Sequence, residues 1–111
     1  MSVALARSLW EHVLHEKRSH PRVEVDLTVV CERKDGPALE GVAKDLSMGG
    51  MFIECAESVP FGTQLTIVAR LSGGEVRLVG IVRWAKPGGL GVQFGLLGAR
   101  ETHALANMLK H

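Results

Sequence analysis

The stretch VEVDLTVVCE, residues 23–32, alternates apolar and polar side chains with a period of two. This period places every second side chain on one face of an extended chain, which predicts a strand with one buried face. The apolar positions of the alternation are Val23, Val25, Leu27, Val29 and Cys31. Pro21 stands just before the strand and ends any preceding helix, because proline lacks a backbone N–H and disfavours helical geometry at His20.

Further short strands follow along the chain. We expect them at residues 39–44, 51–55, 65–71, 76–84 and 90–94. Turn residues separate them, namely residues 34–37, the pair Gly73-Gly74 and residues 87–89. Short strands at regular spacing with glycine-rich turns indicate a small antiparallel barrel or sandwich. Closure of such a sheet would hide its exposed strand edges.

Helical patterns flank this β region. In residues 3–17, apolar side chains recur at i, i+4 (Leu5, Leu9 and Val13), and residues 99–110 carry Leu105, Met108 and Leu109 on one side. The 111 residues suit one domain and are too few for two cores. We therefore divide the chain into an N-terminal helix (1–17), an arm and β region (18–96) and a C-terminal helix (98–110).

Composition narrows the classes of partner. Lys and Arg number 13 against 12 Asp and Glu, a net charge of +1, whereas a protein that coats DNA or RNA needs a strongly basic face. No apolar run approaches the roughly 20 residues needed to insert into a membrane, and residues 1–18 lack the apolar stretch of a secretion signal. Cys31 and Cys55 lack metal-site or redox spacing, so we expect buried, reduced thiols and a cytoplasmic location.

Two segments carry side chains suited to an anionic ligand. Residues 17–22, KRSHPR, place two arginines four apart across a proline, and guanidinium groups bind phosphate oxygens or the guanine edge through paired hydrogen bonds. Residues 45–50, DLSMGG, predict a loop that offers a carboxylate for guanine N–H groups and a hydroxyl for phosphate. Its glycines permit positive φ and close backbone approach. Each segment alone is common in proteins; their combination is not.

Catalysis and metal binding find little support in the sequence. His12, His15 and Glu16 lie on one face of the predicted first helix, but a further ligand with suitable spacing is missing. The acidic residues form no evident acid–base pair, and no serine or cysteine stands in an evident catalytic arrangement. We predict no enzyme activity and no metal or cofactor.

The combination Arg18-x-x-x-Arg22 and Asp45-x-Ser47-x-x-Gly50 resembles the signature of the PilZ domain family. The segments GMFI (50–53), GIVRW (80–84) and GVQF (91–94) agree, so the similarity covers residues 16–110. The resemblance implies a mainly β fold, a six-stranded antiparallel barrel with an N-terminal and a C-terminal helix. It also implies a site for the bacterial second messenger cyclic di-GMP, formed as the arginine-bearing arm folds over the barrel.

The resemblance also assigns roles to individual residues. Arg18 and Arg22 would contact guanine and phosphate, Asp45 guanine N–H groups, and Ser47 phosphate or nearby backbone. Gly50, with Gly49, would shape the loop. Lys17, directly before the first arginine, would influence whether one ligand or a stacked pair binds, and mildly favours the pair. From its register with Leu78 and Val82, Trp84 is expected to pack inside the barrel, and a place near the guanine is the alternative.

The family resemblance implies a receptor that changes conformation on binding cyclic di-GMP and signals to a separate effector protein. The alternative is a ligand-independent adaptor, but such relatives typically lack the signature residues that are all present here. A single-stranded nucleic acid binder would need more exposed aromatic residues and a basic groove. Homodimer formation and the identity of the effector stay open.

Overall fold

The computed structural model describes residues 22–71 and 74–109, which form six strands and one helix. The predicted N-terminal helix, together with His12, His15 and Glu16, lies outside the described residues. The elements are β1 (Arg22–Arg33), β2 (Gly36–Ser47), β3 (Gly50–Glu54), β4 (Gln64–Leu71), β5 (Gly74–Lys86), β6 (Gly89–Phe94) and α2 (Ala99–Leu109).

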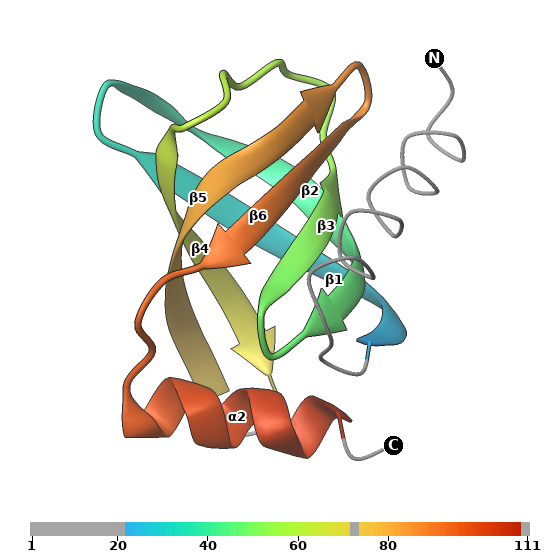
Figure 1. Cartoon of the computed structure of the whole chain (residues 1–111), viewed down its shortest axis with the longest axis vertical. Coiled ribbons are helices and arrows are strands. Elements are labelled where there is room, and N and C mark those ends of the chain that lie inside the picture. Colours follow the sequence, from blue (N-terminus) through green and yellow to red (C-terminus); the bar gives the residue numbers. More distant parts are fainter. Residues whose placement is uncertain (1–21, 72–73, 110–111) are drawn as a thin grey trace.

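The six strands close into one barrel (Figure 1). Around the barrel the order is β1-β2-β3-β6-β5-β4, every neighbouring pair is antiparallel, and β1 closes the ring against β4. Closure leaves no free sheet edge among these strands, which removes a template for aggregation. The prediction of a six-stranded antiparallel barrel is confirmed.

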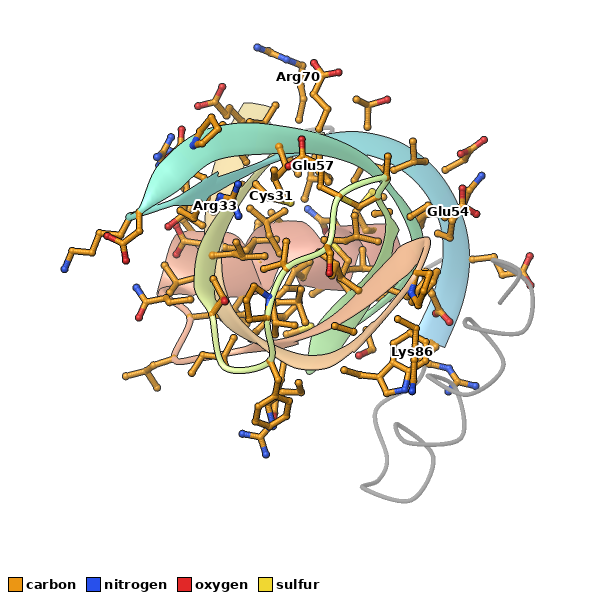
Figure 2. All side chains as sticks on the ribbon, turned by 90° about the horizontal axis from the view of Figure 1, so that it is seen from above. Cys31, Arg33, Glu54, Glu57, Arg70 and Lys86 are labelled. Carbon is orange, nitrogen blue, oxygen red and sulfur yellow. The ribbon has the colours of Figure 1, made fainter. Side chains whose placement is uncertain are left out.

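The barrel interior is filled by the alternating apolar residues of the strands. Val29 and Cys31 of β1 are buried, and Leu65, Ile67 and Ala69 of β4 alternate with more exposed neighbours. Figure 2 shows Cys31 within the ring of strands, whereas Arg70 points away from it. The period of two therefore determined the inward face of β1 and β4 correctly.

Two cysteines belong to this core. Cys31 and Cys55 are both buried and both free thiols, as expected. Burial in apolar surroundings, with a smaller contribution from the thiol of Cys55, raises the pKa of Cys31 to about 11. Because a thiolate is the reactive form, Cys31 acts here as a small apolar side chain.

Helix α2 covers one end of the barrel (Figure 1). Leu105 is fully buried and packs into the core, with Met108 and Leu109 partly buried beside it. The helix contacts β5 and β2. The expected apolar side of the C-terminal helix is therefore the side that packs on the barrel.

Candidate functional site

The predicted DLSMGG loop is shorter than expected. β2 continues through Ser47, so Asp45 and Ser47 lie on a strand and only Met48-Gly49 connects it to β3. The prediction that β2 ends near residue 44 was wrong, because residues 45–47 stay paired with β1 and residues 45–46 with β3, beyond a β-bulge between Ala43 and Asp45. A bulge inserts one extra residue and changes which residues face inward, so the simple alternation is lost there.

After the bulge, the signature residues face outward from the barrel. Leu46 is 1% exposed and belongs to the core, which places Asp45 and Ser47 on the opposite, outer face of β2. Both are nevertheless only 2% exposed. The site therefore begins as a pair of buried polar side chains on the outer wall of the barrel.

The hydroxyl of Ser47 fixes the β2–β3 turn. Its Oγ accepts hydrogen bonds from the backbone N–H groups of Gly49 (3.0 Å) and Gly50 (3.2 Å). These bonds hold the backbone in a serine turn, in which a side chain replaces a backbone acceptor. Of the two expected contacts of Ser47, phosphate or nearby backbone, the backbone contact is present in the structure.

Gly50 of the turn is required by close packing rather than by unusual dihedral angles. A Cβ atom on Gly50 would lie within 3.0 Å of the carbonyl oxygen of Val92 in β6. The carbonyl oxygen of Gly49 accepts a hydrogen bond from the N–H of Phe94 at 2.9 Å. Described glycines with positive φ are found elsewhere, at Gly62, Gly74 and Gly88. The turn is thus held by Ser47 on one side and by β6 on the other.

Arg22 lies at the same end of the sheet as the serine turn. It is the first residue of β1, is exposed, and stands directly opposite Ser47 in the β1–β2 register. Glu24 stands opposite Asp45 in the same register. The structure therefore brings together Arg22, Asp45, Ser47, Gly49 and Gly50. Lys17 and Arg18 lie outside the described residues, and their roles stay predictions.

An aromatic pair shares the outer face with Asp45. Phe52 stands opposite Asp45 on β3, between the inward-facing Met51 and Ile53. Its ring lies 6.1 Å from that of Trp84, centroid to centroid, with the planes tilted by 53°. Sequence analysis did not single out Phe52, because an apolar residue within a buried strand carries no sign of a site.

Trp84 does not pack inside the barrel as expected. A second bulge, between Val82 and Trp84, shifts the register of β5 against β6. Trp84 pairs with Gly91, which in turn pairs with Phe52, so the tryptophan is half-buried and stands on the same outer face as Phe52. The expectation failed because the extra residue reverses the inward–outward alternation.

A hollow lies elsewhere on the wall of the barrel. Its volume is about 550 Å³, and it is lined by Thr28, Glu40, Gly41, Val42, Glu54, Cys55, Ala56 and Gly88. None of these is a predicted site residue, and two carboxylates make it a poor match for phosphate. Within residues 22–71 and 74–109 no three His, Cys, Asp or Glu side chains gather to hold a metal ion. In this same part of the chain, no helix is long and apolar enough to span a membrane.

Comparison with solved structures gives the same fold. The PilZ domain of CeSA from a cellulose-synthesizing bacterium is similar at 22% identity and a TM-score of 0.69, over 80% of this chain and 94% of that one. The PilZ domain of YcgR from Escherichia coli, solved with c-di-GMP, is similar at 15% identity and a TM-score of 0.70, over 84% and 88%. PlzA of Borreliella burgdorferi, in complex with c-di-GMP, is similar at 18% identity and a TM-score of 0.66, over 93% and 46%.

Comparison of sequences identifies the family. No curated protein gave a significant match. The sequence profile described as PilZ domain, however, matches residues 16–110, nearly the whole chain. That span contains both arginines, the serine turn and all six strands. The chain therefore belongs to the PilZ domain family.

Proposed function

We propose that this chain is a receptor for cyclic di-GMP, with a binding site formed by Lys17, Arg18, Arg22, Asp45, Ser47, Gly49 and Gly50. The observation that carries the proposal is the position of Arg22 opposite Ser47, at a turn that the Ser47 hydroxyl holds in place. Asp45 lies two residues away on the same outer face. Two solved PilZ proteins of similar fold contain this ligand, which supports the assignment.

The hydrogen bonds within the β2–β3 turn indicate which residues are available to contact the phosphates and the guanines of the ligand. The N–H groups of Gly49 and Gly50 already donate to Ser47 Oγ, so they do not serve as phosphate donors. The phosphate contacts then belong to the guanidinium groups of Arg18 and Arg22, which bind oxyanions through two parallel hydrogen bonds. Asp45 accepts hydrogen bonds from guanine, and its burial strengthens them because little water competes. Lys17 lies next to Arg18 and favours a stacked pair of ligands.

The strength of such a site suits a reversible signal. A hydrogen bond to a charged group contributes about 1.5–3 kcal/mol. Three or four such contacts, less the cost of ordering the arm, approach the roughly 8 kcal/mol of a micromolar complex. Ordering of the arm around residues 17–22 then changes the surface shown to a separate effector protein, which requires that the two states differ in ligand affinity.

Calorimetric titration with cyclic di-GMP tests the proposal. We expect micromolar binding to the full chain and none of GTP at the same concentration. Arg22→Ala and Asp45→Asn should each weaken binding about 10- to 100-fold, the equivalent of one charge-assisted contact. Arg70→Ala is the matched control, because Arg70 is exposed on β4 and belongs to no part of the site.

The opposite result is equally informative. A folded protein, verified by its thermal unfolding, that takes up no cyclic di-GMP at millimolar concentration would exclude the receptor. The chain would then be a ligand-independent adaptor of the same fold. Equal losses in Arg22→Ala and Arg70→Ala would show a general charge effect and no defined site.

A further inference from the structure

Four large apolar side chains are exposed on one wall of the barrel. They are Phe61 (69% exposed), Val79 (41%), Ile81 (40%) and Leu96 (100%), and we call them the β5 stripe. Val79 and Ile81 belong to β5, whereas Phe61 precedes β4 and Leu96 follows β6. Single exposed apolar residues are ordinary, but a contiguous group marks an interaction surface.

Backbone hydrogen bonds place the four residues along the same wall of the barrel. Val79 and Ile81 alternate outward from β5, about 7 Å apart by strand geometry. The N–H of Gly62 donates to the Val82 carbonyl at 2.7 Å, which places Phe61 beside one end of the pair. The N–H of Gly95 donates to the Val79 carbonyl at 2.9 Å, which places Leu96 at the other end.

Among the described residues, the unpaired charged group nearest the stripe is the positive guanidinium of Arg83. The register partners of Ile81 on the two neighbouring strands are Gln64 and Gln93, both uncharged. The guanidinium of Arg83 lies 5.9 Å from the centroid of the Phe61 ring. In the part of the chain that the structure describes, Arg83 forms no ion pair. Aromatic residues and arginine are both enriched at protein interfaces, and arginine is also enriched at their energetic centres.

We propose that the β5 stripe is the docking surface for an acidic, amphipathic segment of a partner protein. Apolar side chains of that segment would cover the stripe while a carboxylate pairs with Arg83. This inference deepens the proposed function, on which it rests, by naming the surface through which the receptor meets its effector. In the strand order of the barrel, β5 stands opposite β2, so the stripe and the site around Ser47 are on different walls (Figure 1).

The charges on the outer face of β5 argue against two other binding partners for the stripe, a second copy of the chain and a lipid membrane. A second copy of the chain in a two-fold dimer centred between Val79 and Ile81 would place Arg83 opposite the Arg77 of the other copy, a like charge that Glu32 already pairs within its own chain. An anionic membrane surface is recognised by clusters of about four to eight cations, whereas the outer face of β5 carries two arginines, Arg77 paired with Glu32 and Arg83 beside the Phe61 ring. An acidic, amphipathic partner segment can cover the exposed apolar side chains and also supply a carboxylate for Arg83.

Two synthetic helical peptides test the proposal on the full chain without cyclic di-GMP. Both carry leucines at i, i+3, i+4 and i+7; one has glutamates at the flanking positions and the other has lysines. Titration of the 15N-labelled protein should shift the amide signals of Phe61, Val79, Ile81, Arg83 and Leu96 with the glutamate peptide. The lysine peptide should bind about tenfold more weakly.

Variants connect that binding to the stripe. Ile81→Gln should weaken the glutamate peptide about tenfold, and Arg83→Glu should reverse the preference in favour of the lysine peptide. Thr28→Gln, a change on the outer face of β1, should leave binding unchanged. Because no nucleotide is present, the outcome is independent of whether the chain binds cyclic di-GMP.

Three results would overturn the inference. Equal affinity for both peptides, or signal shifts away from the stripe, would show that no acidic segment is selected. A dimer in analytical ultracentrifugation that dissociates in Ile81→Gln would make a second copy the occupant. Cosedimentation with phosphatidylcholine–phosphatidylglycerol vesicles, lost in the same variant, would make it a lipid surface.

Discussion

Ser47→Ala separates the structural role of this serine from any contact with a ligand. The substitution removes the acceptor of two N–H groups, those of Gly49 and Gly50. A buried donor without a partner costs about 1–3 kcal/mol. Gly50 is buried and incurs this cost, whereas half-buried Gly49 reaches water and incurs less. We expect the free energy of unfolding of the ligand-free protein to fall by about 2–3 kcal/mol.

Urea denaturation and calorimetry of the ligand-free protein measure this loss. With ΔΔG of 2–3 kcal/mol, a domain of this size should melt about 10 °C lower. Ser58→Ala is the matched control, because Ser58 is exposed and makes no hydrogen bond among the described residues. It should change stability by less than about 0.5 kcal/mol. If Ser47→Ala were as stable as Ser58→Ala, the hydroxyl would not hold the turn, and the N–H groups of Gly49 and Gly50 would again be candidates for phosphate donors.

Two further substitutions test the core and the turn. Gly50→Ala should destabilise the protein by about 2–4 kcal/mol in urea denaturation, because the added Cβ meets the Val92 carbonyl and must displace β6. Gly95→Ala should be nearly neutral, because the nearest atom to its Cβ lies at 3.8 Å. Equal losses of stability in the two variants would contradict the close approach at Gly50. The pKa of Cys31 is raised from 9.0 to about 11, so its contribution to stability is complete below pH 9 and is lost as the pH rises toward 11, by at most about 3 kcal/mol. Cys31→Ala should reduce this loss of stability between pH 9 and 10.5 in urea unfolding, and an unchanged pH dependence would exclude Cys31 as its source.

The barrel could be predicted from the sequence where its strands are regular. In β1 and β4, every second residue faces the core, and alternation alone identified Val29, Cys31 and Ile67 as inward. The Gly-rich turns then divided the chain into strands. Local periodicity succeeds here because each side chain obeys the same two-residue repeat.

Prediction failed where bulges interrupt that repeat. Pairing with β1 and β3 extends β2 beyond the expected residue 44, and the bulge before Asp45 turns both signature residues outward. The bulge before Trp84 moves its ring from the expected core to the outer face beside Phe52. A bulge has no sequence signature of its own in either place, because the extra residue is recognised only from the partner strand.

The site itself depends on pairing between distant segments. The motifs predicted which residue types would act, but the position of Arg22 opposite Ser47 follows from the β1–β2 register. The role of Ser47 as the acceptor for its own turn was one of two expected contacts, and its presence is visible only in the geometry. Residue chemistry is thus readable in the sequence, whereas register comes from tertiary structure.

The serine turn and the β5 stripe are connected by two consecutive residues. The N–H of Phe94 donates to the Gly49 carbonyl, and the N–H of the next residue, Gly95, donates to the Val79 carbonyl in the stripe. Leu96 follows directly. A shift of the turn on ligand binding would therefore act on the backbone that positions Leu96. Such a connection transmits a signal only if the turn has two arrangements of different ligand affinity. If the turn has two such arrangements, the Ser47 hydrogen bonds stabilise one of them, and weakening these bonds then alters peptide binding at the stripe without any change to its own residues.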